Sequence, residues 1–306
     1  MLTTLATLAG LALAQQTDTT VPVRAGARLE VNNFGGEIAV KTWSKSAVRI
    51  AASHSSRDRI TIDASDQVVR VKSESRRGPS QVVDYEITVP AAMALALSGV
   101  YTDISVEGSQ GEITAETVQG TVNVSGGVGT VSLKSVQGDV TLEKARGRID
   151  LSSVNETIKA SQISGDVSAE TVNGDISLVQ IESANTEATT VNGDVTYDGT
   201  IKDSGRYRFS THDGDLRVSI PEKSSVSVSV STFNGDFSAC FPVQLTLPKT
   251  KHRFSFTIGS GSARLELESF NGDIRLCRPG QLGKDKDWRV KDKDWDKDHD
   301  NDQEEE

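Results

Sequence analysis

The 306-residue sequence is poor in several residue types on which common architectures depend. Aromatic residues make up only 5% of it, which argues against a large globular core packed around Phe, Tyr and Trp. Its 7 Pro exclude collagen-like and proline-rich structures. The two cysteines, Cys240 and Cys277, cannot supply a four-cysteine zinc site or a disulfide scaffold.

Long apolar runs and excess positive charge are also missing. No apolar run reaches the roughly 18 residues that a membrane-spanning helix needs, so we expect no transmembrane helix. The net charge of −10 and the pI near 5.0 argue against nucleic-acid binding, which requires a basic face.

The two ends differ in composition from the rest. Residues 1–14 hold a short apolar stretch that ends in Ala12-Leu13-Ala14, which predicts a signal peptide although the usual basic residues are missing. We therefore expect export to the periplasm, the cell surface or the medium; a docked or disordered N-terminal tail is the alternative. Residues 284–306 hold 6 Lys/Arg and 11 Asp/Glu and repeat KDKDW, which predicts a disordered charged tail. Its Trp288 and Trp295 could dock on a partner.

Between these ends, glycines recur on a nine-residue grid that only Glu156 interrupts and that later loosens. The grid glycines are Gly111, Gly120, Gly129, Gly138, Gly147, Gly165, Gly174, Gly193, Gly214, Gly235 and Gly272.

Two columns that follow each grid position are apolar in all twelve rows. Two positions on are Ile113, Val122, Val131, Val140, Ile149, Ile158, Val167, Ile176, Val195, Leu216, Phe237 and Ile274. Four positions on are Ala115, Val124, Leu133, Leu142, Leu151, Ala160, Ala169, Leu178, Tyr197, Val218, Ala239 and Leu276. Polar residues stand between them, and this period-two alternation predicts short strands.

The segments TVQG, SVQG, SVNE and TVNG resemble each other and recur at every second grid position. One coil of about 18 residues therefore has two short strands and two corners. Later coils grow to about 19 and then about 21 residues, as surface corners tolerate. Stacking such coils about 4.8 Å apart pairs each strand with its copies above and below. The sequence thus predicts an all-β fold, a β-solenoid resembling a parallel β-helix, and we expect right-handed coiling.

We predict a single solenoid domain over residues 17–283, with regular repeats over 93–283. Residues 17–92 lack the strict grid but still alternate as strands, which favours a cap and first coils. A small separate β-domain ending near Pro90 is the alternative.

At the corners, Gly and Asn suit turns, and stacked Asn side chains can form hydrogen bonds along a ladder. The column holds Asn155, Asn173, Asn192, Asn234 and Asn271.

Four pieces in this order resemble a bacterial putative-adhesin family of β-strand repeats, a domain of unknown function. They are LEVNNFGGEIAVKTW at 29–43, YEITVPA at 85–91, the repeated V-N-G-D-I/V units, and IGSGSARLELESFNGDIRL at 258–276. The resemblance implies an exported or envelope-associated solenoid without established catalytic residues. It does not extend to the KDKDW tail.

An Asp column follows the corner glycines and raises the question of calcium. Its members are Asp139, Asp175, Asp194, Asp215, Asp236 and Asp273, with Asp166 on the other edge. Asp175, Asp194, Asp215 and Asp236 are the calcium candidates of a β-roll interpretation. Each corner supplies one Asp and few other oxygens, whereas Ca²⁺ takes six to eight, so we favour hydrogen bonding of each Asp within its own turn.

The sequence gives little support for catalysis. His212 lies in the column of Val136, Val154, Val172, Val191, Phe233 and Phe270, where a lone histidine is more often structural than catalytic. No isolated carboxylate pair and no clustered aromatics are evident, so a carbohydrate-active or carbohydrate-binding solenoid is the alternative only. We predict no enzyme, no cofactor and no catalytic residue.

Cys240 and Cys277 occupy equivalent repeat positions, five residues after their glycines. Coils one step apart permit a disulfide, whereas two steps exceed the ~7 Å Cα limit. The stretch between the two glycines fits either two coils or one coil with a hairpin around Pro248. Both possibilities remain open.

The sequence thus favours a monomeric adhesive, structural or scaffolding protein of the cell envelope. Its partner would be an envelope or extracellular protein or polysaccharide. Outward positions would supply specificity, and they include Lys134, Glu143, Lys159, Glu170, Arg217 and Arg275.

Overall fold

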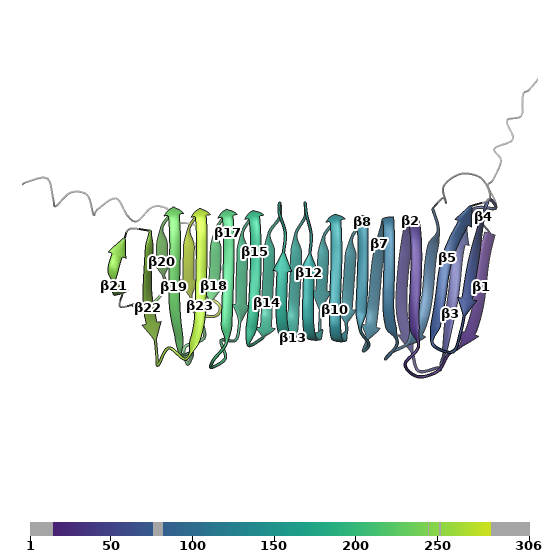
Figure 1. The fold of residues 1–306 in the computed structure, drawn as a ribbon, viewed down its shortest axis with the longest axis horizontal. Helices are drawn as coiled ribbons and strands as arrows, with labels where there is room; N and C mark the ends of the chain where they lie inside the picture. The colour runs from purple at the N-terminus through teal and green to yellow at the C-terminus, as the bar shows by residue number, and fades with distance from the viewer. Residues whose placement is uncertain (1–14, 76–81, 244, 251, 283–306) are drawn as a thin grey trace, which may run out of the picture.

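The computed structural model describes residues 15–75, 82–243, 245–250 and 252–282, and these form 24 strands with no helix among them. The all-β prediction is confirmed. The strands stack side by side into a long body, with β1 at one end and β21 at the other (Figure 1). The predicted signal peptide, 1–14, and the predicted tail, 284–306, lie outside the described residues. None of the described residues forms a helix with the length and apolar content needed to cross a bilayer.

One face of the middle of the body is a parallel ladder. In spatial order it contains β9 (Val122–Gly126), β11 (Val140–Glu143), the first half of β13 (Ile158–Glu170), β14 (Ile176–Glu182), β16 (Val195–Gly199) and β18 (Leu216–Ser219). Val122 pairs with Val140, Val140 with Ile158, and Ile158 with Ile176, so equal steps along the chain join successive strands. The next steps, to Val195 and then to Leu216, are each longer than the one before, as the sequence predicts.

The opposite face is a second parallel ladder of the same coils. It contains β8 (Ile113–Gln119), β10 (Val128–Gln137), β12 (Arg146–Ser152), the second half of β13, β15 (Asn185–Asn192) and β17 (Arg206–Asp213). Stacked copies pair directly, because each coil returns to the same place one strand spacing further along.

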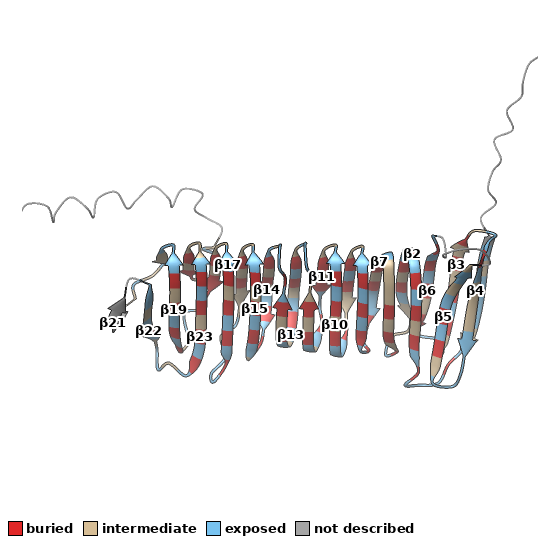
Figure 2. Ribbon diagram, turned by 45° about the horizontal axis from the view of Figure 1, so that its top comes forward, coloured by how far each residue is buried: buried red, intermediate tan, exposed pale blue. Residues whose placement is uncertain are grey.

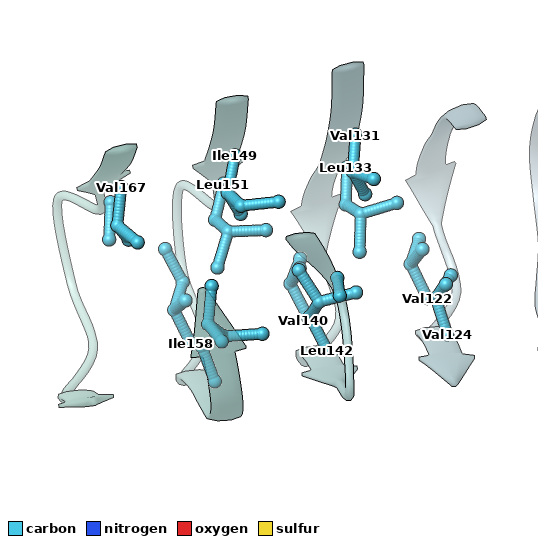
Figure 3. Close-up of a cluster of buried hydrophobic side chains, with 14 of the residues drawn as sticks. Val122, Val124, Val131, Leu133, Val140, Leu142, Ile149, Leu151, Ile158 and Val167 are labelled. Carbon is cyan, nitrogen blue, oxygen red and sulfur yellow. The ribbon is translucent and has the colours of Figure 1, made fainter. Parts of the chain in front are cut away.

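The core is a thin layer between the two ladders. Buried and exposed residues alternate along nearly every strand (Figure 2). Val122, Val140, Ile158 and Ile176 are at most 1% exposed and form one contiguous file. Aliphatic side chains of the opposite ladder point toward that file (Figure 3). Such a layer suits small branched side chains, which accounts for the low aromatic content.

The N-terminal end departs from chain order. β2 (Arg28–Trp43) pairs in parallel with β7 (Ala94–Ser109), and on its other side with β5 (Val68–Ser75) and β6 (Asp84–Pro90). The first coils are therefore not stacked in sequence order. The coil of β2 lies between β7 on one side and β5 and β6 on the other, and all three of these strands follow β2 in the chain. β2 and β7 join this end to the repeats through an unbroken ladder.

Antiparallel strands close the N-terminal end. β3 (Ala47–His54) pairs with β6, and β1 (Gln15–Pro22) pairs with β3, both antiparallel. On the other face β4 (Asp58–Ala64) is antiparallel to β5. They cover the edges that parallel coils would otherwise expose.

The C-terminal end also breaks chain order. The coil of β23 (Ala263–Asn271) and β24 (Ile274–Cys277) inserts between the coil of β17 and β18 and that of β19 (Val226–Asn234) and β20 (Phe237–Ala239). A hairpin of β21 (Leu245–Thr250) and β22 (Arg253–Ile258) follows antiparallel to β19. The Gly214 coil thus lies next to the Gly272 coil rather than next to the Gly235 coil.

Candidate functional site

An exposed apolar row, which we call the stripe, runs along one corner of the stacked coils. In spatial order it consists of Phe34, Val118, Val136, Val154, Val172, Val191, His212, Phe270 and Phe233, with Tyr101 and Val82 beside Phe34. Of the large hydrophobic side chains exposed in the described part of the chain, only Val128 lies elsewhere. An apolar row of this length that the described part of the chain leaves exposed indicates an interaction surface.

The stripe arises from the way each coil turns its corner. The Ser or Thr that precedes each stripe valine points inward, and its hydroxyl bonds a corner carbonyl. Ser135 donates to Gly120 (2.9 Å) and Thr190 donates to Gly174 (3.0 Å), each in the neighbouring coil. Strand alternation then turns the next side chain outward. The recurring Ser/Thr-Val-Gln/Asn is the signal in the sequence from which these inward hydroxyls could have been predicted.

The stripe ends in a stack of four rings. His212 and Phe270 lie 4.6 Å apart between ring centroids, and Phe270 and Phe233 lie 4.8 Å apart with only 3° between their planes. His252 stacks on the far side of Phe233 at 5.5 Å. A shallow depression of about 620 Å³ lies over these rings. The expectation of no clustered aromatics is wrong, because the inserted coil brings Phe270 next to Phe233.

The corner next to the stripe carries a ladder of amides. Asn173 donates to Asn155 (3.1 Å), Asn192 to Asn173 (2.7 Å), and Asn234 to Asn271 (2.9 Å). Asn271 donates to Asp213, which takes the Asn position in its coil (2.6 Å). This agrees with the expected ladder of stacked Asn side chains.

The Asp row follows the amide ladder around the same corner. The Oδ1 atoms of Asp175, Asp194 and Asp215 each accept the backbone N–H of the Asp in the next coil (2.8–3.0 Å), and Asp236 donates its N–H to Asp273 (2.9 Å). The expected bonding within each Asp's own turn is thus wrong: the bonds join coils.

Backbone N–H groups and Arg217 are the partners of the carboxylates in this row. Arg217 bridges two of these carboxylates, with 2.7 Å to Asp194 and 2.9 Å to Asp215. Across the described residues, no group of three His, Cys, Asp or Glu side chains is placed to hold a metal ion. Calcium requires six to eight oxygens, and the arrangement offers scattered single carboxylates instead.

The remaining outward charges are spread over the two faces. Lys134, Glu143, Lys159 and Glu170 are exposed, while Arg217 and Arg275 are half-buried. A second shallow depression, of about 550 Å³, is lined by charged residues that include Arg148, Asp166, Arg206 and Arg264. Charges of both signs occur there, so this face has no single-sign character.

A disulfide between Cys240 and Cys277 joins the last two coils, with 4.8 Å between their Cα atoms. The sequence left open whether the two cysteines are two coils apart or one coil apart with a hairpin between them. The structure has the second arrangement. Arg278 follows Cys277; its guanidinium lies 3.9 Å from the Phe241 ring centroid and bonds the Ile220 carbonyl (3.1 Å). These contacts fasten the C-terminal end, away from the stripe.

Strongly shifted pKa values belong to core tyrosines. Burial raises the pKa of Tyr85 to about 12, and it also raises the pKa of Tyr197 and of Tyr207. The Tyr207 hydroxyl donates to the Ser183 carbonyl (2.7 Å), and Tyr197 donates to Thr200 (2.8 Å). Tyr197 and Tyr207 thus hold the loops of the longer coils in place, and none of the three tyrosines belongs to the stripe.

Taken together, the stacked coils, thin core and exposed corner define a solenoid-like β-repeat protein. The chain belongs to the Toastrack DUF4097 family, whose model matches residues 27–277. This confirms the resemblance to a putative-adhesin family of unknown function. No curated protein matches the chain.

Solved structures show the same fold. One described as a "putative adhesin" from Parabacteroides merdae has 10% identity and a TM-score of 0.51, covering 86% of this chain and 96% of its own. Another from Parabacteroides distasonis has 9% identity and a TM-score of 0.50, covering 87% and 98%. At such identities the similarity concerns fold alone.

Proposed function

We propose that the protein is a non-enzymatic, exported binding rod of the cell envelope, with an adhesive or scaffolding role. The stripe carries this proposal. It is an apolar row that extends over consecutive coils and that the described residues leave exposed, as expected of a surface that another molecule covers. The described pockets are shallow and lie on the outside of the ladders, which suits surface contact better than enclosure of a small substrate.

Export is supported by the disulfide, since such bonds persist in oxidising compartments. The neighbours described as "putative adhesin" share the fold and agree with a surface role. A carbohydrate ligand gains some support from the four-ring stack. However, the rings cover one another's flat faces, which are the surfaces on which a sugar would stack.

Fractionation of native cells tests the location, and binding to isolated envelopes tests the role. We expect the protein in the envelope, periplasmic or extracellular fraction without residues 1–14, and saturable binding of the purified chain to envelopes. Incubation with a polysaccharide panel should release no reducing ends. Recovery from the cytoplasm with Ala14 still attached, or turnover of any polysaccharide, would overturn the proposal.

A further inference from the structure

The middle of the stripe shares its corner with carboxylates that, among the described residues, form no ion pair, and the amide ladder lies between the two rows. From this juxtaposition we propose that the stripe from Val118 to Val191 binds a cationic amphipathic α-helix of a partner protein, lying along the rod. The inference rests on the proposed function, since it names the partner chemistry of the same surface.

The apolar half of the surface consists of five valines in consecutive coils. Val118, Val136, Val154, Val172 and Val191 are each between 36% and 49% exposed, and each stands directly after an inward Ser or Thr. Burying each against a partner would remove a similar apolar area, so binding should depend on several of them together.

The acidic half consists of Asp139, Glu156 and Asp175, which occupy the same corner in three consecutive coils. Backbone N–H groups of neighbouring coils hold one oxygen of Asp139 (3.1 Å) and one of Asp175 (2.8 Å). Among the described residues these carboxylates form no ion pair. Lys159 occupies the repeat position that Arg217 occupies in a later coil. Arg217 bridges two carboxylates there, whereas Lys159 forms no ion pair with Asp139, Glu156 or Asp175.

Glu156 is the position at which the glycine grid breaks. Neighbouring coils place Gly138 and Gly174 in that column, so a solenoid corner does not call for a carboxylate there. Glu156 stands one position before the Asp column, where Thr157 takes the place of an Asp, so this corner carries one carboxylate in each of three consecutive coils. No metal-binding group of three acidic side chains forms in the described structure, so basic side chains of a partner are the natural counter-charges.

Spacing favours a helix as the partner. Coils repeat about every 4.8 Å, and an α-helix brings a side chain back to the same face about every 5.4 Å. Over four coils the mismatch reaches only about 2.4 Å. An extended strand repeats on one face at about 6.8 Å and would be out of step by about 8 Å. A second copy of this chain would bring its own carboxylates and be repelled.

The test uses the full chain and a labelled peptide of about 18 residues, or five helical turns, with a Leu stripe flanked by Lys, measured by fluorescence anisotropy. We expect saturable binding that V136T/V154T/V172T weakens at least tenfold and D139N/E156Q/D175N at least fivefold. The Asn substitutions keep the amide-bonding oxygen, so the fold should persist. Raising the salt concentration should also weaken binding. V128T, at an exposed valine away from the stripe, should bind as the wild type does.

Several results would overturn the inference. They are equal binding of a peptide with Glu in place of Lys, equal binding of a scrambled peptide, or unchanged binding by either triple variant. Self-association of the chain that V136T/V154T/V172T abolishes would assign the surface to a second copy instead. If peptide binding fails while that variant still loses envelope binding, only the helix inference fails. If envelope binding is also unaffected, the stripe itself loses its proposed function.

Discussion

Cys240 and Cys277 are 37 residues apart in the chain, yet their Cα atoms lie 4.8 Å apart on adjacent coils. They meet because the coil of β23 and β24 inserts next to β20 after the β21–β22 hairpin. The disulfide therefore closes a loop that contains the whole excursion. It fastens the outermost coil to the one beneath it.

Removing this bond should loosen the C-terminal end first. We expect C240S/C277S to lower the free energy of unfolding by about 2–4 kcal/mol, because the unfolded chain regains loop entropy. Limited proteolysis should cut the β21–β22 hairpin earlier, while β8–β15 remain protected. Equal protease resistance of oxidised wild type and variant would contradict this role.

The inward hydroxyls at the stripe corner should contribute measurably to stability. Thr190 is 2% exposed and donates to the Gly174 carbonyl. T190V keeps the shape but removes the donor, which should cost about 1–3 kcal/mol in urea unfolding. T130V, at an exposed position of β10, should cost less than about 0.5 kcal/mol. Similar losses for the two variants would refute the role of the inward hydroxyl.

The corner glycines pack too closely to accept a side chain. A Cβ at Gly138 would lie 1.9 Å from the Gly120 carbonyl oxygen, which is backbone and cannot move aside. We expect G138A to cost more than about 3 kcal/mol. At Gly26 (φ +82°) a Cβ would meet nothing within 4 Å, so G26A should cost only about 1 kcal/mol. The free energies of unfolding of both variants, measured by thermal unfolding, separate the two causes. G26A introduces backbone strain alone, whereas G138A adds the close contact with the Gly120 carbonyl.

Alkaline pH should destabilise the fold through Tyr85. Burial raises its pKa from 10.0 to about 12 in the folded chain, so the folded state keeps a proton that the unfolded state releases. This contribution is complete below pH 10 and is lost as the pH rises toward 12. At about 1.4 kcal/mol per pH unit, wild type should lose about 2–3 kcal/mol more than Y85F over this range. Parallel pH profiles of the two proteins would contradict the assignment.

The sequence predicts the interior of this fold well and its ends poorly. The files of Val122 and Val124 could be predicted because strand alternation and the nine-residue grid are local patterns. The insertion of the β2 and β23 coils could not be predicted, because no local sequence pattern indicates which coils are neighbours in space. The need to cover open edges determines that order.

The same distinction applies to the candidate surface. The column containing Val136 and Phe270 was visible in the sequence, but whether it faced the core or the solvent depended on how the corner turned. Phe233 and Phe270 became neighbours only through the inserted coil. Handedness of the coil and the state of the two chain ends stay predictions.

The most direct test of the account compares envelope binding by two variants of the purified chain. V136T/V154T/V172T removes apolar character from the stripe, and V128T makes the same change at an exposed valine elsewhere. With both folded by circular dichroism, we predict that the triple variant loses at least nine-tenths of saturable binding while V128T keeps the wild-type level. Full binding by the triple variant would contradict the claim that the stripe is the binding surface.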